Sequence, residues 1–233
     1  MSKAENVIRY YVLCNNLKEV IRTGWLNWHV KSPRIESVAE HIYGVEMLAI
    51  AMKSEYQYDI DLEKVIFMIA VHELEEIFIG DLTQFEITKA EKVIIGHEAV
   101  KNILKDLIDK DIVEALIIEF DERKTKEALF AYYCDKLECD IQSKLYDEAN
   151  CVDLTKQSDN ETSKDPRIIS LINKGMSFGE MWMTFGKQTY NYDDFFLEVS
   201  NYALNNQISK YNIEIESYRK KIGKKSYVRS KKK

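Results

Sequence analysis

The scarcity of helix-breaking residues constrains the fold of this chain more than any other feature of its sequence. Only two prolines and eight glycines occur in 233 residues, which is about 1% and 3% against average usages of roughly 5% and 7%. Sandwiches and barrels need frequent turns, and those turns are rich in glycine and proline. The sequence therefore predicts an all-α fold of long helices, in one domain or one domain with an appendage.

The charges are unevenly distributed along the chain. Residues 219–233 carry nine Lys or Arg and no acid, so the net charge of -6 leaves 24 bases against 39 acids, or -15, in the preceding 218 residues. A body this acidic repels a nucleic-acid backbone. We therefore expect no nucleic-acid partner, and we predict that the basic tail over 219–233 is a disordered, solvated end.

The sequence also bears on the compartment. No segment approaches the roughly 18 apolar residues of a membrane helix, and the N-terminus holds no apolar run of signal-peptide length. The four cysteines contain no CxxC pair and are too few for a disulfide scaffold of this size: Cys14, Cys134, Cys139 and Cys151. These features predict a cytoplasmic protein with reduced thiols and no membrane partner.

Apolar periodicity predicts helices over most of the chain. We expect an opening helix over about 5–22 with a rough apolar stripe that includes Val7, Ile8, Tyr11 and Val12, and then a loop over 22–36. Ser37 and Glu40 have the spacing of a capping box, and the helix that follows turns His41 inward. Further helices are predicted over about 61–79, 88–109, 111–120 and 125–148. A polar, exposed loop over 151–167 and a C-terminal helical extension over 168–218 complete the chain.

The segment 65–79, VIFMIAVHELEEIFI, places acids in an apolar helix. An ionised carboxylate in an apolar interior costs several kcal/mol unless something positive compensates it. A single cation beside this helix could be bound by His72 and Glu73, with Glu76 in the next turn. The alternative is that the helix reaches the surface and its acids face water.

Known short motifs narrow the chemistry of this segment. The metalloprotease pattern H-E-x-x-H fails because Glu76 stands where the second histidine is needed, and no Walker or dinucleotide-binding motif occurs. What remains is a wider group, with His41 on an inward face, His72 and Glu73 on an apolar helix, and Asp135 in the stretch FAYYCDKLECD (130–140). Two imidazoles and two carboxylates suit Zn, Mn, Fe or Co better than Ca.

The order His, His-acid, Asp resembles the HD-domain metal-dependent phosphohydrolases, and more specifically the YfbR-type 5'-deoxynucleotidases and their eukaryotic relatives. The resemblance covers about residues 5–150 and rests on RTGW (22–25), ESVAEH (36–41), VHELEEIFIGDLT (71–83) and CDKLE (134–138). It implies an HD-domain helical bundle over 1–150, with additional C-terminal helices. It also implies hydrolysis of a (deoxy)nucleoside 5'-monophosphate to nucleoside and phosphate, with one divalent metal ion: Mn, Co, Zn, Fe or Mg.

Carried across by position, the resemblance assigns His41, His72, Glu73 and Asp135 as the metal ligands. The family's second motif is His-Asp, whereas this chain has His72-Glu73. Glutamate is one methylene longer, and useful metal–oxygen distances vary by only about 0.2 Å. If the helix retreats or Glu73 binds with altered denticity, a hydrolase is preserved. If the site is weakened instead, the chain is a noncatalytic nucleotide-binding or scaffold protein of the same fold.

The same resemblance assigns four residues to substrate and catalysis. Glu76 matches the glutamate that acts on the attacking water, and Asp81 matches an aspartate near the substrate and the nucleophile. Arg22 matches an arginine that contacts the phosphate. Trp25 approximately matches a tryptophan that shapes the sugar pocket, although the loop between Trp25 and His41 is about two residues longer than in some relatives.

Other possibilities stay open at this level. His97 could belong to a second metal site, although we expect a mononuclear centre. A nucleoside triphosphate or cyclic dinucleotide substrate needs more basic residues around the pocket than Arg22 and Lys136 obviously offer.

The aromatic residues over 178–196 are predicted to be core and not a nucleobase platform. By analogy with relatives, a homodimer is an open possibility.

Overall fold

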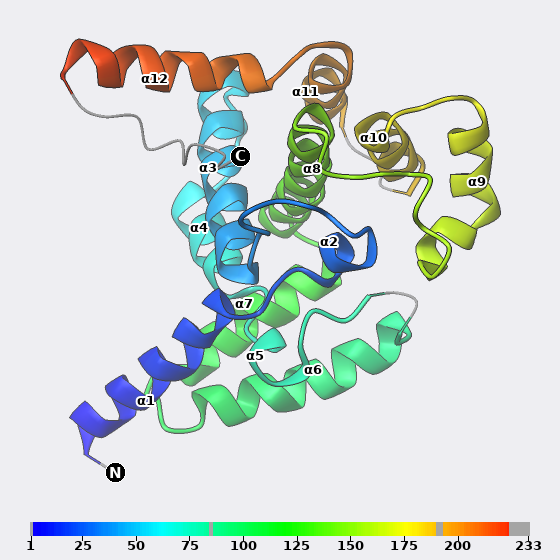
Figure 1. Cartoon of the computed structure of the whole chain (residues 1–233). Coiled ribbons are helices and arrows are strands. Elements are labelled where there is room, and N and C mark those ends of the chain that lie inside the picture. The colour runs from blue at the N-terminus through cyan, green and yellow to red at the C-terminus, as the bar shows by residue number, and fades with distance from the viewer. Residues whose placement is uncertain (1, 84–85, 190–192, 224–233) are drawn as a thin grey trace.

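The computed structural model describes residues 2–83, 86–189 and 193–223, and the regular structure in these ranges is helical (Figure 1). The β-type pairing that they contain is an isolated antiparallel bridge between Ile21 and Ser37. The all-α prediction is confirmed. No described helix combines the length and the apolar character that a membrane crossing requires.

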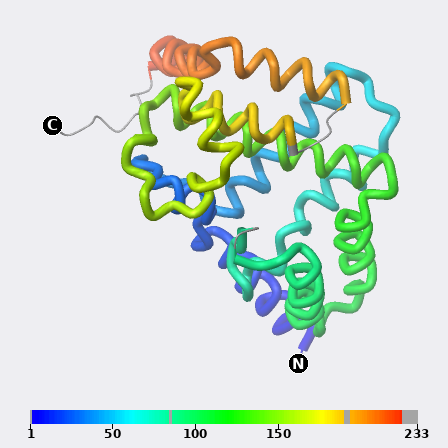
Figure 2. Tube along the Cα trace, turned by 90° about the vertical axis from the view of Figure 1, so that its right-hand side faces the viewer, coloured from blue at the N-terminus to red at the C-terminus, as the bar shows by residue number. Residues whose placement is uncertain are grey.

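Helix α8 (Lys126–Glu148) lies at the centre of the fold and packs against α3 (Val38–Tyr56), α4 (Leu62–Val71) and α7 (Lys110–Glu122). On its other side it packs against α10 (Phe178–Thr189) and α11 (Asp194–Asn205) (Figures 1 and 2). Because α8 contacts both groups of helices, a side chain on α8 can reach either the predicted core or the C-terminal extension.

The remaining helices complete the chain around this core. They are α1 (Lys3–Asn15), α2 (Thr23–Asn27), α5 (Glu76–Ile79), α6 (Lys89–Leu104), α9 (Pro166–Asn173) and α12 (Asn212–Lys221), with short 3-10 turns at Asn16–Lys18, Glu161–Lys164 and Ser209–Tyr211. Helix α2 falls inside the segment 22–36 that we predict as a loop. The C-terminal helices form as predicted, but α12 extends to Lys221 and so includes the start of the predicted tail. Residues 224–233 lie outside the described residues.

Helix α3 forms as its sequence predicts. Ser37 accepts a hydrogen bond from the backbone N–H of Glu40, while the Glu40 side chain accepts one from the N–H of Ser37, which is a complete capping box. The inward face of the helix carries Val38, His41, Val45, Ala49 and Met52, all buried. The local cap therefore fixes the register that places His41 in the interior.

The predicted helix over 61–79 is interrupted. Helix α4 ends at Val71, residues 72–75 form turns, and α5 begins at Glu76. Through this segment the backbone bonds span three residues instead of four, as in the bond from the Glu76 N–H to the Glu73 carbonyl at 3.2 Å. At this tighter winding, side chains three apart line up. The turn therefore aligns Glu73 with Glu76 more closely than a regular helix does, in which side chains three apart share a face but are offset by about 60°.

Helix α1 differs from the prediction in its packing. It begins with a capping box at Ser2 and has no buried residue, and the expected apolar stripe is exposed at Val7, Ile8, Tyr11 and Val12. Polar contacts tie the helix to the end of α6, because the Arg9 guanidinium donates to the carbonyls of Ile103 and Asn102. Apolar periodicity predicted the helix but not what it packs against.

The segment 151–167 is exposed at many positions, as we predict, but not throughout. Gln157 and Asn160 are buried, and the Gln157 amide donates to the carbonyl of Trp28. Their side chains supply the hydrogen bonds that a buried loop backbone needs. The segment is therefore part of an apolar satellite cluster beside α8, formed by Trp25, Trp28, Val30, Tyr146, Cys151, Ile168, Leu171, Phe178 and Met181.

Two glycines on one face of α10 allow it to approach α8 closely. A Cβ at Gly179 would lie 3.0 Å from the Lys144 Cα, and a Cβ at Gly186 would lie 2.5 Å from an oxygen of Asp140. The two positions are seven residues apart, which is two turns of helix. This close approach sets the position of the α10 side chains next to the site described below.

Candidate metal centre and adjoining cavity

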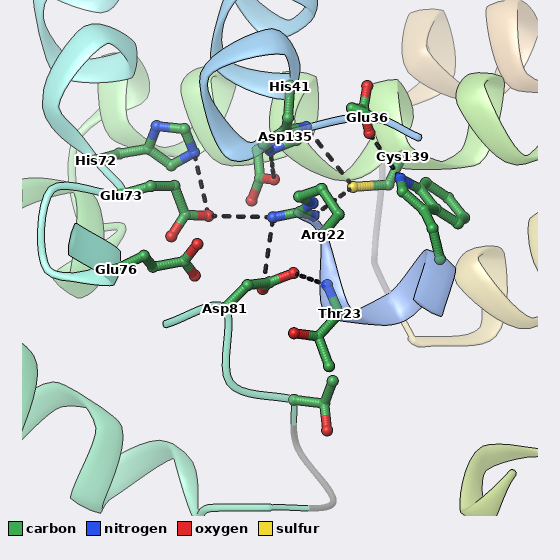
Figure 3. Close-up of polar contacts among 12 residues, drawn as sticks. Arg22, Thr23, Glu36, His41, His72, Glu73, Glu76, Asp81, Asp135 and Cys139 are labelled. Carbon is green, nitrogen blue, oxygen red and sulfur yellow. Dashed lines mark hydrogen bonds and ion pairs between the residues drawn. The ribbon is translucent and has the colours of Figure 1, made fainter. Parts of the chain in front are cut away.

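The four predicted metal ligands lie together in the interior (Figure 3). Helix α3 supplies His41, the turn after α4 supplies His72 and Glu73, and α8 supplies Asp135. Each offers one ligand atom, and the four atoms all lie within 4.8 Å of one another. All four residues are buried, so the acids do not face water as the alternative interpretation of the sequence requires.

Hydrogen bonds orient the His41 imidazole. Its Nδ1 lies within hydrogen-bond distance of a Glu138 carboxylate oxygen, at 2.6 Å, and its Nε2 lies 3.1 Å from Asp135 Oδ1. A histidine ligand typically donates its second ring nitrogen to such a carboxylate, which fixes the ring and its tautomer. With the proton on Nδ1, a lone pair and a carboxylate oxygen face each other, and this arrangement is stabilised by a cation between them.

His72 provides an independent indication of a ligand. Its Nδ1–H donates to the Ile69 carbonyl at 2.7 Å. Its Nε2 is buried and has no hydrogen-bond partner among the described residues. Buried polar atoms without a partner are costly. The orphaned nitrogen and the chemistry of the four donors therefore fit a divalent transition-metal ion.

The extra methylene of Glu73 does not remove its carboxylate from this group. Glu73 Oε1 lies 3.5 Å from His72 Nε2. Burial raises the pKa of Glu73, but Lys92 and Arg22 nearby, with a contribution from His72, outweigh burial and lower the pKa to about 2. The glutamate is thus an ionised ligand candidate, and the turn at residues 72–75 gives it the necessary position.

Arg22 and Asp81 lie next to the four ligands. Arg22 Nη1 lies 3.9 Å from Glu73 Oε1 and 3.7 Å from Asp81 Oδ1. Asp81 also accepts a hydrogen bond from the backbone N–H of Thr23 at 2.6 Å, so it holds the start of α2 close to the site. The second guanidinium nitrogen of Arg22 donates to the Cys139 sulfur at 3.2 Å.

Glu76 is almost fully buried, with 1% of its surface exposed. One of its oxygens accepts a hydrogen bond from Lys92 at 2.9 Å, and the other has no partner among the described residues. Burial raises the pKa of Glu76 well above its usual value, and the nearby carboxylates of Glu73 and Asp81 raise it further. A carboxyl group with a raised pKa is suited to exchanging a proton near neutral pH.

A cavity of about 520 Å³ adjoins the site, within the usual range of small-molecule pockets. One part of its lining is cationic, with Arg22, Lys89, Lys92, Arg123 and Lys136. Another part is aromatic, with Trp25, Trp28, Trp182 and Phe185. The two kinds of lining match a ligand with an anionic end and an aromatic end.

The aromatic lining corrects one prediction. Phe178 and Phe196 are core residues as expected, but Trp182 and Phe185 are half-buried and line the cavity. Trp25 is buried with its ring centroid 4.8 Å from that of Trp182, and its indole N–H donates to Glu36 at 2.7 Å. Aromatic content alone does not distinguish a core face from a cavity wall, because both exclude water.

Sequence reasoning missed some residues of the site. The sequence predicts no role for Glu138, which orients His41; its position three residues after Asp135, on the same face of a helix, was the available signal. Lys89, Lys92 and Arg123 carried no local signal. His97 lies outside the four-ligand group and pairs with Asp121 at 2.7 Å.

Comparisons with known proteins bear on the family and the fold of this chain. A family model described as HD domain matches residues 14–176. A protein named 5'-deoxynucleotidase HDDC2 from Dictyostelium discoideum is 34% identical over 152 residues, which cover 61% of this chain and 78% of that protein.

Two solved structures share the fold. A conserved hypothetical protein from Pyrococcus furiosus is 27% identical, with a TM-score of 0.54 over 72% of this chain and 99% of that one. A predicted metal-dependent phosphohydrolase from Magnetospirillum magnetotacticum is 17% identical, with a TM-score of 0.54 over 87% of this chain and 94% of that one. The second likeness bears on the fold alone.

Proposed function

The chain belongs to the HD-domain family, and on that premise we propose that it is a metal-dependent phosphohydrolase that converts a (deoxy)nucleoside 5'-monophosphate to nucleoside and phosphate. The observation that carries the proposal is the meeting of four buried ligand atoms, including the orphaned His72 Nε2, beside a cavity with cationic and aromatic linings. The similarity to a 5'-deoxynucleotidase supports the substrate class.

His41, His72, Glu73 and Asp135 hold the divalent ion in this proposal. Such an ion, when bound, supplies positive charge for the phosphate oxygens and makes a water molecule more acidic. The noncatalytic alternative requires the Glu73 carboxylate to fall short of the other ligands, whereas it lies among them. We therefore favour the enzyme, with Mn, Co, Zn, Fe or Mg as the candidate metals.

Arg22 holds the phosphate in this proposal. The guanidinium lines the cavity and has a planar fork that suits two phosphate oxygens. Asp81 positions Arg22, because it pairs with the guanidinium at 3.7 Å while it accepts the N–H of Thr23. The phosphate thereby lies between Arg22 and the ligand group.

Glu76 accepts the proton of the attacking water. One of its oxygens has no hydrogen-bond partner among the described residues, and its raised pKa makes the carboxylate a stronger proton acceptor. Lys92, bonded to the other oxygen, keeps the carboxylate in place. At the opposite wall, Trp25 shapes the sugar site and Trp182 offers a ring for the nucleobase.

The test is phosphate release from nucleoside mono-, di- and triphosphates with Mn, Co, Zn or Mg. We expect release from 5'-monophosphates, with deoxynucleotides preferred, and its loss in His72→Ala. Activity no higher than that of His72→Ala under every condition would contradict the proposal.

Two further predictions accompany the proposal. All four cysteines are free, which is typical of the reducing cytoplasm, where we place the enzyme. A homodimer, by analogy with relatives, stays a prediction that the mass of the protein in solution can test.

A further inference from the structure

The cavity is lined by more positively charged side chains than have a carboxylate partner. Three of the five cations have carboxylate partners: Arg22 pairs with Asp81, Lys92 with Glu76, and Lys136 with Asp135. Within the described ranges, Lys89 and Arg123 line the same cavity but form no ion pair. These two cations are therefore available to an anion from solution.

The structure holds Arg123 in a specific position. Arg123 ends α7 with φ of 53° and ψ of 34°, a left-handed conformation that favours glycine. From there its guanidinium lies 3.6 Å from the centroid of the Tyr132 ring, and its Nε is buried without a hydrogen-bond partner among the described residues. An arginine that occupies a glycine-type position and leaves a buried N–H unsatisfied is poorly explained by folding alone.

The positive charges of the neighbouring cations repel one another. The Lys136 ammonium lies 5.4 Å from the centroid of the same Tyr132 ring, so one aromatic ring holds two positive groups. Burial lowers the pKa of Lys89, and the positive charges of Arg123 and Lys136 lower it further, although the Asp121 carboxylate offsets part of this effect. A bound anion would relieve this repulsion and could accept the free N–H of Arg123.

We propose that Arg123 and Lys89 form a second phosphate subsite, separate from the position held by Arg22, so that the cavity takes nucleotides that carry two phosphate groups. The inference rests on the proposed function for the identity of the first phosphate. The second phosphate can extend from the 5' position, as in a nucleoside 5'-diphosphate, or stand on the sugar, as in a nucleoside 3',5'-bisphosphate. Both present the same charge to Arg123.

The structure brings to the cavity the additional basic residues that such ligands require. A substrate with more than one phosphate needs more basic residues than Arg22 and Lys136, and the turn after α7 and the first turn of α6 bring two of them to the cavity. A monophosphate carries at most two negative charges, and Arg22 and the metal ligands already surround its proposed position.

Calorimetric binding tests this subsite. In the Glu76→Gln background, which slows turnover, we would titrate deoxyadenosine 5'-monophosphate, 5'-diphosphate and 3',5'-bisphosphate. We expect at least one two-phosphate ligand to bind roughly tenfold or more tightly than the monophosphate, as expected for a hydrogen bond between charged groups. Arg123→Asn should abolish that preference and change monophosphate affinity less than about twofold.

Matched variants keep the test specific. Asparagine tolerates the left-handed backbone, so Arg123→Asn should fold, and an unchanged melting temperature checks this. Lys124→Asn removes an exposed charge one residue away, paired with Glu122, and should leave the preference intact.

The outcomes separate this inference from the proposed function. Equal affinity for all three nucleotides, or an equal loss for all three in Arg123→Asn, would overturn the subsite even if the enzyme hydrolyses monophosphates. A preference that depends on Arg123 supports the subsite even if the chain with Glu76 intact releases no phosphate. The ligand that shows the preference identifies which of the two phosphate positions Arg123 contacts.

Discussion

The site has two ends, the candidate metal centre and the aromatic wall of the adjoining cavity, and they are built in opposite ways. In the candidate metal centre, charged groups lie in an apolar interior, and directed contacts hold them, as Glu138 holds His41 and Lys136 holds Asp135. At the aromatic end, Trp25, Trp28 and Trp182 pack through their rings. Burying a charge without a partner costs several kcal/mol, whereas apolar packing tolerates substitutions that conserve side-chain volume.

The two ends also come from different parts of the chain. The four ligands lie within residues 14–176, which match the HD-domain family. Trp182 and Phe185 belong to α10, which begins at Phe178 and so lies beyond that match. We expect the residues that match the family model to provide the chemistry, while α10 adds Trp182 and Phe185 to the surface that contacts the nucleoside in the proposed function. The predictions below test this division.

The largest effect is expected at Glu76. Glu76→Gln should lower kcat by about a hundredfold or more, because an amide cannot accept the proton of water, while metal content stays unchanged. Glu75→Gln is the matched control, since Glu75 is the adjacent acid and burial, together with Glu73, raises its pKa to about 8. Steady-state kinetics of both variants check this. A comparable loss in both would remove the special role of Glu76.

A smaller effect is expected at the aromatic end. Trp182→Ala should raise KM for the nucleotide roughly tenfold, since stacking of a base on an aromatic ring contributes about 1–3 kcal/mol. Metal content and inhibition by inorganic phosphate should not change. Trp182→Phe keeps a ring and should retain most of the affinity. If Trp182→Ala instead lost metal, the two ends would not be separable.

The smallest effect concerns Glu36, which lies between the two ends. It accepts the indole N–H of Trp25, and burial raises its pKa to about 7, with Glu138 adding to the rise. Because the folded state binds this proton more tightly than the unfolded state, the Glu36 contribution to stability falls as pH rises from about 4.5 to 7.

Glu36→Gln should therefore raise the free energy of unfolding at pH 8 by on the order of 1–3 kcal/mol, and the gain should shrink toward pH 5. Glutamine can still accept the bond from Trp25. Denaturant unfolding at several pH values checks this, with kcat expected to be unchanged. Parallel stability profiles of the two proteins would contradict the buried-acid account.

Local signals made part of this structure predictable. The Ser37 capping box and the inward face of α3 fixed His41, and the periodicity of α8 together with the CDKLE match indicated Asp135. The order of motifs predicted the four candidate ligands, which the structure brings together. These features depend on residues close together in sequence, where side-chain and backbone preferences decide the outcome.

The features that the sequence did not predict depend largely on contacts between distant segments. The turn at residues 72–75 could not be predicted, because the apolar pattern continues on both sides of it and indicates one helix. Arg123 and Lys89 meet only through the packing of α7 and α6, and Gln157 becomes buried only through its bond to Trp28. Periodicity shows which face is apolar but not which partner covers it, as the exposed face of α1 also illustrates.

The number of divalent ions bound per chain tests the central claim most directly. Elemental analysis of the purified protein should find about one equivalent of metal, as four well-placed ligands predict. The metal should be lost in His72→Ala and in Asp135→Ala, and kept in His97→Ala, whose histidine pairs with Asp121 outside the ligand group. A chain that binds no metal under any condition, or an equivalent that survives His72→Ala, would contradict the account.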